Sequence, residues 1–396
     1  MSSTESLQEK LNRVHGISRG VAMVCVLVAF FCLFVNPEAF YRSYLLGYVY
    51  TIGICLGSLA LLMVHHLTGG HWGFAIRKIL EANTRCLPLM LILFLPIVLP
   101  GGMNILYAEW LHAEGDPIIE AKAAYLNYGA WVVRAVILFG VWGTLIWFLN
   151  TWSIRQDRTG DINLTRSLRM LSGPGVVLYF LATTVAAWDW GMSLDPLWFS
   201  SMYGPLFVIS QGLTTLAFCI VVAHWLSRYK PISDVMPKQV YHDIGNLTFA
   251  FGVLWAYMSV MQFIIIWSAN LPEENPYYLD RSGTGWNLIA VALALFHFAV
   301  PFLILLMRHS KLNKDNLIKV AYWILIMRGV DYYWHIFPAF HPRDLAFSPI
   351  HIVVPVALLA VYVWYFLGQL KGRPLLPLHD PRYETAPATA EATTHR

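Results

Sequence analysis

The sequence predicts an all-α polytopic membrane protein of about ten transmembrane helices, arranged as two four-helix bundles plus two flanking helices. Of its 396 residues, 57% are hydrophobic and 13% are charged, and the mean hydropathy is +0.55. A soluble domain carries roughly 25% charged residues. The apolar residues gather in stretches long enough to cross a hydrocarbon core of about 30 Å, at about 1.5 Å per residue. The basic residues gather in every second loop.

The chain begins with a polar segment, residues 1–17, which precedes one continuous membrane domain, residues 18–371. Because no small-residue cleavage site follows the first apolar stretch, we expect a retained helix. The bundles are expected at about 44–193 and 199–338, and the Pro/Ala/Thr-rich tail 372–396 is expected to be disordered. The ten predicted spans are 18–35, 44–66, 87–107, 128–152, 173–193, 199–226, 243–269, 284–308, 316–338 and 350–370.

The charge of the loops alternates along the chain. One set is rich in Lys and Arg, and includes Arg77, Lys78 and Arg85 in a predicted loop before the third span. The other set is mostly acidic, with Glu109 and Asp280 as examples. Since cytoplasmic loops carry the excess of Lys and Arg, both termini are expected in the cytoplasm.

Composition also limits the cofactors and partners. The formal charge of +4 is small and gives no indication of nucleic acid binding. The five cysteines have no metal-ligand spacing, and no CxxC, haem-attachment or ferredoxin-like run is present. No span offers a pair of histidines with the spacing of a two-haem cytochrome b. We therefore expect no redox centre and no metal bound by the chain itself.

Ionisable residues inside the predicted spans are the main candidates for function. Asp189, Arg328 and Asp331 lie roughly 18–24 Å from the cytoplasmic helix ends, Arg134 about 9 Å from the outer side, and His335 one turn beyond Asp331. An isolated charge at this depth costs at least about 2.5–3.5 kcal/mol. These five residues are expected to gather in the outer half. They could conduct protons or face a quinone; alternatively, they could be ion pairs that only fix helix packing.

A second group of polar residues suggests a path from the cytoplasmic side. His242 and Asp243 open the seventh span, Tyr257 lies further along it, and His297 lies near the middle of the eighth span. Together they could form an inward half-path toward Asp331. Interfacial solvation of His242 and simple core packing of His297 are the alternatives.

The two buried aspartates also occur in similar surroundings. The fifth span ends in Trp188-Asp189-Trp190, and the ninth contains Asp331-Tyr332-Tyr333-Trp334. The two spans run in the same direction, four spans apart, which fits a parallel repeat of two four-helix units. Chance similarity of two Asp-aromatic clusters is the alternative.

Several longer motifs stand out along the chain: His242-Asp243, Phe249-Ala250-Phe251, Trp255-Ala256-Tyr257, the run from Ile266 to Glu274, the run from Trp188 to Pro196, and Ser201-Met202-Tyr203-Gly204. These motifs resemble the second large membrane subunit of alternative complex III, a branch of the polysulfide-reductase/NrfD-like membrane family. The resemblance covers essentially all ten spans.

This resemblance implies a subunit of a quinol:electron acceptor oxidoreductase in a bacterial inner membrane. The implied partners are an NrfD-like paralogous membrane subunit, an iron–sulfur subunit, multihaem and monohaem cytochrome c subunits, small membrane subunits and often a terminal oxidase. Haem c and iron–sulfur clusters would belong to those partners. For this subunit, the resemblance implies a proton-translocation role, with Asp189, His242, Asp243, Asp331 and His335 as the matching positions. Quinone binding stays open.

Two other function classes fit the same ten spans. A secondary transporter would also place charged residues near the midplane, although the repeat is parallel and no predicted span is clearly broken around a substrate pocket. A structural scaffold for the catalytic paralogue would tolerate neutral replacement of Asp189, Asp243 and Asp331.

Overall fold

The computed structural model describes residues 7–113, 116–230, 232–377 and 379–380. Within these ranges the chain is helical and forms no strand. The first half contains α1 (Leu7–Val35), α2 (Pro37–Thr68), α3 (His71–Thr84), α4 (Leu87–Val98), α5 (Pro100–Leu106), α6 (Ala108–Leu111), α7 (Pro117–Ala121), α8 (Tyr128–Thr159), α9 (Asn163–Trp190) and the 3-10 turn η1 (Met192–Leu194).

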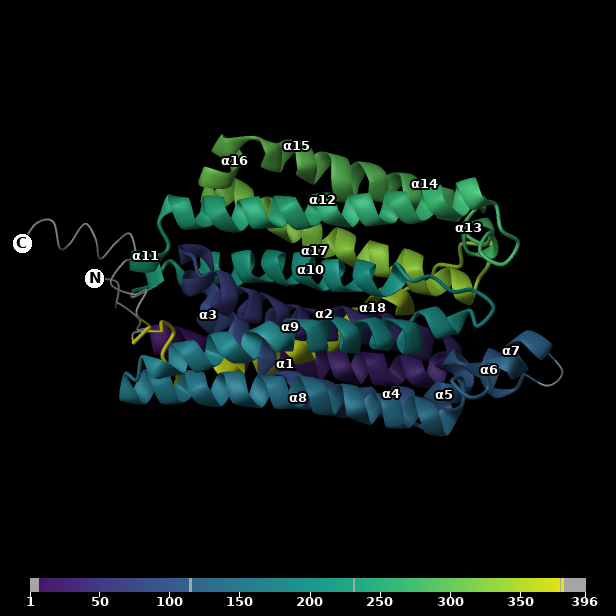
Figure 1. Cartoon of the computed structure of the whole chain (residues 1–396), viewed down its shortest axis with the longest axis horizontal. Helices are drawn as coiled ribbons and strands as arrows, with labels where there is room; N and C mark the ends of the chain where they lie inside the picture. Colours follow the sequence, from purple (N-terminus) through teal and green to yellow (C-terminus); the bar gives the residue numbers. More distant parts are fainter. Residues whose placement is uncertain (1–6, 114–115, 231, 378, 381–396) are drawn as a thin grey trace, which may run out of the picture.

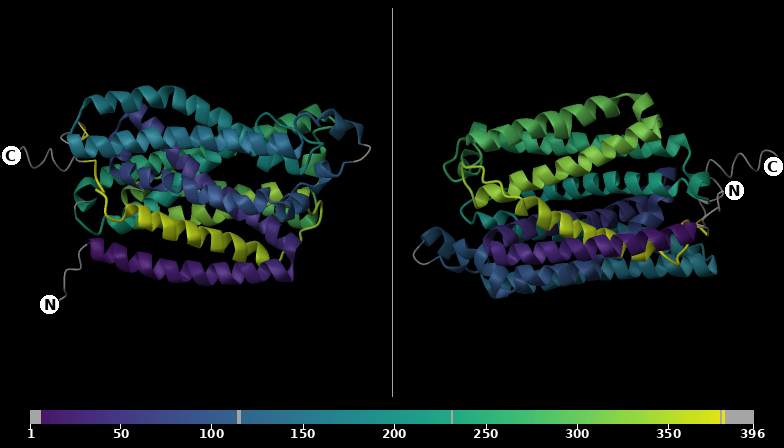
Figure 2. Two further views of the ribbon diagram at one scale, coloured as in Figure 1. Left: turned by 90° about the horizontal axis from the view of Figure 1, so that it is seen from below. Right: turned by 180° about the vertical axis from the view of Figure 1, so that it is seen from behind.

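The second half contains α10 (Tyr203–Leu226), α11 (Ile232–Val235), α12 (Lys238–Ala269), α13 (Pro276–Leu279), α14 (Thr284–Ala292), the π-helix η2 (Leu293–Ala299), α15 (Val300–Leu306), α16 (Arg308–Leu312), α17 (Lys314–Ile336), the 3-10 turn η3 (Phe337–Ala339) and α18 (Ile350–Leu370). The long helices lie side by side along the length of the molecule (Figures 1 and 2).

The all-α membrane fold predicted from the sequence is confirmed. In the described residues, eight helices are long and apolar enough to cross a membrane, and the pair α3–α4 makes a ninth span if counted as one. α17 is outside that set; it carries Lys319, Arg328 and Asp331 yet lies lengthwise among the others (Figure 1). The order of passes places the start of α1 and the end of α18 at one end, here called the inner end; the opposite end is the outer end.

The third crossing differs from the prediction. We expected a loop before residue 87 and no broken span, but α3 and α4 form a pair bent by 41°. Residues 77 and 78, predicted to lie in a cytoplasmic loop, are instead buried in α3. The sequence misleads here because α3 carries charged residues, whose ion pairs inside the protein cannot be seen from local hydropathy.

Helix ends follow ordinary capping chemistry. The side chains of Asn36, Asn127 and Asn313 accept hydrogen bonds from backbone N–H groups in the first turns of α2, α8 and α17. Gly160 ends α8 in the left-handed conformation, with φ of 67°, which glycine adopts without a steric penalty. Local sequence therefore defines where several of the long helices begin and end.

The packing centres on two helices, α2 and α10, which are buried along most of their length. α2 packs against α3, α4, α9 and α18, whereas α10 packs against α12 and α17 and joins the two groups through α2 and α9. Gly57 permits the close approach of α2 and α10, because a Cβ there would lie 2.5 Å from the carbonyl oxygen of Gln211. α1 lies outermost, against α18 (Figure 2).

The segment after α18 also differs in part from the expectation of disorder for 372–396. Leu376 and Asp380 are buried, and Asp380 forms an ion pair with Arg77 at 2.7 Å. A buried carboxylate partner for a buried guanidinium explains why this polar stretch packs onto the protein. The rest of the predicted tail, 381–396, lies outside the described residues, as do residues 1–6 of the predicted N-terminal segment.

Candidate functional site: a buried charged cluster at the outer end

The strongest candidate site is built on the last turns of α17. Asp331 Oδ2 accepts a hydrogen bond of 2.5 Å from Arg328 Nη1, as the i, i+3 spacing allows. Both side chains are almost completely buried, at 0% and 1% exposure. Arg328 also donates from Nε to Thr214 Oγ1 on α10 at 3.2 Å. The other Asp331 oxygen, Oδ1, has no hydrogen-bond partner among the described residues.

His335 connects this cluster to the outer end. Its Nε2 lies 3.8 Å from Asp331 Oδ1, and its Nδ1 lies 2.9 Å from the hydroxyl of Tyr277 on α13. An imidazole can carry its hydrogen on either nitrogen. Nδ1 of His335 is within hydrogen-bond distance of the Tyr277 hydroxyl, whereas Nε2 faces the Asp331 carboxylate from beyond that distance. Tyr277 itself lies outside the predicted spans, and burial raises its pKa to about 12, so its hydroxyl stays neutral.

Arg281 holds the backbone of this region in place. Its guanidinium donates to the carbonyl oxygens of Trp334, Tyr277 and His335 at 3.2, 2.7 and 2.9 Å. It also lies over the Tyr277 ring, 3.5 Å from the centroid. Because all three donor-bearing nitrogens have partners, Arg281 positions His335 and Tyr277, while its charge is used within the protein.

Two cavities meet at His335 and Arg281. A small pocket of about 20 Å³ at the outer end is lined by both residues together with Tyr277, Asp195 and Asp280. A larger cavity of about 670 Å³ lies between α12, α14 and α17, and its lining also includes Asp331. Burial raises the pKa of the Asp195 carboxyl, while Arg281 opposes that change. His335 therefore lies between the larger cavity and a small polar pocket.

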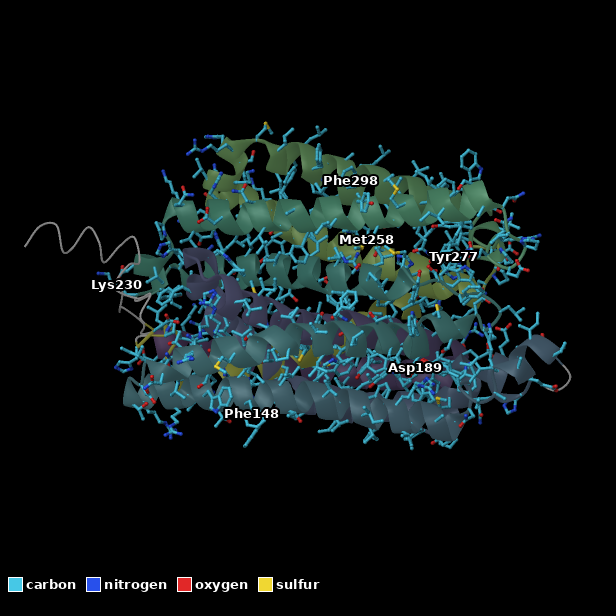
Figure 3. All side chains as sticks on the ribbon, in the orientation of Figure 1. Phe148, Asp189, Lys230, Met258, Tyr277 and Phe298 are labelled. Atoms are coloured by element: carbon cyan, nitrogen blue, oxygen red, sulfur yellow. The ribbon has the colours of Figure 1, made fainter. Side chains whose placement is uncertain are left out.

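The pair Arg134–Asp189 forms a separate site on α8 and α9. Arg134 binds both carboxylate oxygens, through Nε at 2.8 Å and Nη2 at 3.0 Å. It also donates to the Tyr125 carbonyl at 2.8 Å and lies over the Tyr125 ring at 3.7 Å. Asp189 and Tyr277 lie toward the same end of the bundle, opposite Lys230 (Figure 3). The five residues expected to gather in the outer half therefore form two clusters, Arg134 with Asp189, and Arg328 with Asp331 and His335.

The inward half-path is only partly assembled. His242 and Asp243 lie at the inner end of α12, with Nδ1 of His242 3.6 Å from Oδ1 of Asp243. His297 is buried in the π-helix η2, edge-on to Trp255 at 4.3 Å between ring centroids. Neither ring nitrogen of His297 has a hydrogen-bond partner in the described part of the chain. No hydrogen bond between described residues links Asp243 to His297.

Tyr257 does not lie on the predicted path. It is 56% exposed, on a face of α12 turned away from the buried residues Trp255 and Gln262. Because successive residues of an α-helix are about 100° apart around its axis, Tyr257 lies on the same half-exposed face of α12 as Asp243 and Asn246. The sequence places these polar groups on one face of the helix, and in the structure Tyr257 lies on the exposed part of that face.

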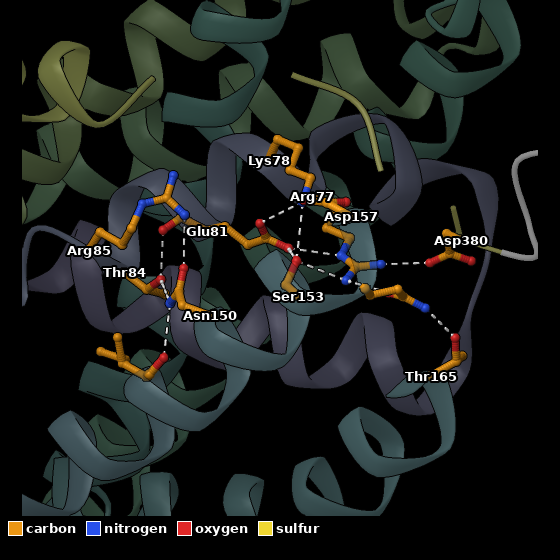
Figure 4. Close-up of polar contacts among 12 residues, drawn as sticks. Arg77, Lys78, Glu81, Thr84, Arg85, Asn150, Ser153, Asp157, Thr165 and Asp380 are labelled. Atoms are coloured by element: carbon orange, nitrogen blue, oxygen red, sulfur yellow. Dashed lines mark hydrogen bonds and ion pairs between the residues drawn. The ribbon is translucent and has the colours of Figure 1, made fainter. Parts of the chain in front are cut away.

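A second buried network of charged residues lies at the inner end, and its charged groups are paired with one another (Figure 4). Glu81 on α3 accepts from Arg77 Nε at 2.9 Å, Lys78 Nζ at 3.0 Å and Ser153 Oγ at 2.6 Å. The network also contains Arg85, Asn150, Asp157 and Asp380. Three cations meet three carboxylates, so the charges balance, and these contacts tie α3 to α8 and to the segment after α18.

Sequence reasoning missed Tyr277, Arg281 and Asp195 as members of the outer site. All three follow spans and looked like ordinary loop residues. The only available signal was that Arg281 is one of few basic residues in an otherwise acidic set of loops. Compared with protein-family models and with curated proteins, the chain gives no match in either comparison.

Proposed function

We propose that this chain is an integral membrane subunit that passes protons between Asp331 and the outer end through His335 and Tyr277. The observation that carries the proposal is the position of His335, with one ring nitrogen 3.8 Å from Asp331 and the other 2.9 Å from Tyr277. A proton taken up at Nε2 allows release of the proton at Nδ1. Ring tautomerisation then resets the residue.

The surroundings support transfer rather than mere packing. Asp331 keeps one oxygen without a hydrogen-bond partner among the described residues, so it has capacity to accept a proton. Beyond Tyr277, the small pocket supplies Asp195 and Asp280 as acceptors near the outer surface. The proposed path therefore covers the outer half of the second helix group. Asp189 and Tyr257 are not part of it.

The proposed setting is a quinol-oxidising respiratory complex in a bacterial inner membrane. The motifs around Asp189 and Asp243 that resemble the NrfD-like subunit of alternative complex III support this setting. In it, a neighbouring subunit oxidises quinol, and this chain, without a redox centre of its own, conducts the released protons. Cytochrome c and iron–sulfur subunits would be its partners.

A secondary transporter is the second candidate, because the α3–α4 crossing is bent by 41°. Broken helices often surround transporter substrates. Near this bend, however, Thr84, Arg85 and Asn150 hydrogen-bond to one another, as Asn150 donates to Thr84 and accepts from Arg85. Such mutual pairing favours structural support over a binding site.

Proton flux in vesicles tests the proposal. The full chain, purified with whatever subunits accompany it, is reconstituted into vesicles, and a potassium diffusion potential drives protons toward an internal pH dye. We expect His335→Gln and Asp331→Asn to reduce flux by roughly tenfold or more, as loss of a positioned proton carrier typically does. His112→Gln, at an exposed position of the same end, is the matched control. Equal flux in all four proteins would contradict the proposal.

A further inference from the structure

The cavity of about 670 Å³ beside Asp331 has the size of a ligand site, since small-molecule pockets are roughly 300–1,000 Å³. Its walls come from α12, α14, η2 and α17, and most of the lining side chains are aliphatic or aromatic. Three lining residues on α12, namely Val260, Phe263 and Trp267, are strongly exposed. The cavity therefore opens on the outward face of α12, within the length expected to lie in the membrane.

Several polar groups in this lining lack partners inside the protein. Gln262 is 4% exposed, and in the described residues neither its amide nitrogen nor its amide oxygen forms a hydrogen bond. The hydroxyl of Ser259, one turn earlier on α12, and the indole nitrogens of Trp255 and Trp334 are likewise buried without described partners. A buried polar group without a hydrogen-bond partner destabilises the folded protein. Five such atoms belong to residues that line this one cavity, where a bound molecule can supply the missing hydrogen bonds.

The chemistry of these atoms restricts the ligand. The two indole N–H groups can only donate, the Ser259 hydroxyl can donate, and the Gln262 amide can donate and accept. Donors thus outnumber acceptors, and the complementary group on a ligand is a carbonyl-type oxygen.

Charge restricts the ligand further. The only charged residues of this lining in the described chain are Arg281 and Asp331. Arg281 has all three nitrogens bound to backbone carbonyls, and Asp331 is paired with Arg328. No cation is free to hold an anionic head group, so the ligand head is neutral.

We infer that this cavity binds a neutral, lipid-soluble molecule whose carbonyl oxygens reach Gln262 and the two indoles while its apolar chain leaves between α12 and α14. Two kinds of molecule have this chemistry: a membrane lipid with ester carbonyls and a lipid-soluble quinone. Binding needs no proton transfer by His335. It can therefore be tested, and can fail, separately from the proton path.

Native mass spectrometry of the full chain, with any co-purifying subunits, in lipid nanodiscs tests this inference. The probes are a decyl-chain benzoquinone, a didecanoyl glycerol and, as a carbonyl-free control, hexadecane. Wild-type protein is expected to retain at least one carbonyl-bearing probe and not hexadecane. Retention of only the quinone, or only the glyceride, identifies the source of the natural ligand.

Two substitutions locate the binding. Gln262→Leu keeps the side-chain size but removes both polar atoms and is expected to weaken probe binding roughly tenfold, the effect of losing one or two hydrogen bonds. Ala290→Phe fills the cavity from α14 and is expected to abolish binding. Ser268→Ala, an exposed polar-to-apolar change on the same helix outside the cavity lining, is the control. Failure of both probes to bind the wild type, or equal binding by all variants, would overturn the inference.

Discussion

Asp189 and Asp331 occupy similar places near the outer ends of α9 and α17, yet their surroundings differ. Arg134 binds both oxygens of Asp189, and Arg134 itself is held by the carbonyl and ring of Tyr125. Asp331 is bound through only one oxygen, and Nη2 of its partner Arg328 also lacks a hydrogen bond in the described chain. A large cavity adjoins Asp331.

This contrast gives a criterion for separating structural from functional charges inside a membrane protein. A buried ion pair whose hydrogen bonds are complete has no capacity left for a proton or ligand, whereas an incomplete pair retains it. On this criterion Asp189 is assigned to the packing of α8 against α9, and Asp331 is the carboxylate that is proposed to carry protons. The inner network around Glu81 belongs with Asp189, because its three cations balance its three carboxylates and Glu81 accepts hydrogen bonds on both oxygens (Figure 4).

The largest expected effect is a loss of stability when one partner of an ion pair is replaced. It tests whether the pairs Arg328–Asp331 and Arg134–Asp189 differ in burial. Asp331→Asn leaves Arg328 fully buried without a countercharge, which costs about 3–5 kcal/mol. Asp189→Asn leaves Arg134, 17% exposed and still bound to Tyr125, so we expect a smaller loss of about 1–2 kcal/mol. Denaturant unfolding in mild detergent measures the free energy of unfolding of both variants. Equal losses would contradict the proposed difference between the two ion pairs.

Replacing both partners of an ion pair at once distinguishes an effect on stability from an effect on proton flux. Replacing both partners by leucine is expected to be close to neutral for stability at either site, because no charge is left unpaired. Proton flux should remain normal in the Arg134→Leu, Asp189→Leu protein and fall at least roughly tenfold in the Arg328→Leu, Asp331→Leu protein. Should the first double variant lose flux as well, Asp189 would have to be returned to the proton path.

Parts of this comparison could be predicted from sequence. Apolar stretches of membrane length predict the crossings, and the i, i+3 spacing predicts the contact of Arg328 with Asp331. Depth along the helices places Asp189 and Asp331 toward the outer end. These features depend on distances along one helix, which sequence specifies directly.

Other parts depend on how the helices are rotated and paired. The apolar residues of α12 are spread around the helix with little asymmetry, so hydropathy alone does not show that Tyr257 is turned outward while Gln262 is turned inward. Asp380 and Arg77 are about three hundred residues apart, and no local signal predicts that they form an ion pair. Tyr277 lies on a helix of one turn, where hydrophobic periodicity carries no information.

A smaller effect tests the end of the path beyond His335. Tyr277→Phe removes only the hydroxyl, so we expect proton flux to fall by a few-fold, less than in His335→Gln, since a water molecule can replace a hydroxyl bridge. Because the pKa of Tyr277 is about 12, this residue should add no inflection to the flux between about pH 6 and 9. If proton flux plotted against pH showed an inflection near neutral pH that Tyr277→Phe abolished, the Tyr277 hydroxyl would not act as a neutral group in the path.

The smallest effect concerns Asp195, which lies in the outer pocket with Tyr277 and Arg281. Burial raises the pKa of its carboxyl in the folded protein, so the folded state holds this proton more tightly than the unfolded chain does. The stabilisation that this bound proton provides is therefore full below the pKa of the unfolded chain and is lost as the pH rises through the pKa of the folded protein. Asp195→Asn removes the charge, so at pH 7 we expect unfolding to need slightly more free energy, by less than about 1 kcal/mol. This gain in the free energy of unfolding should vanish in acid, as measured by unfolding at several pH values.

An Asp195→Asn variant that is less stable than the wild type at pH 7 would mean that the attraction of Arg281 for this carboxylate outweighs the effect of burial. Asp195 would then resemble the fully paired Asp189 rather than Asp331.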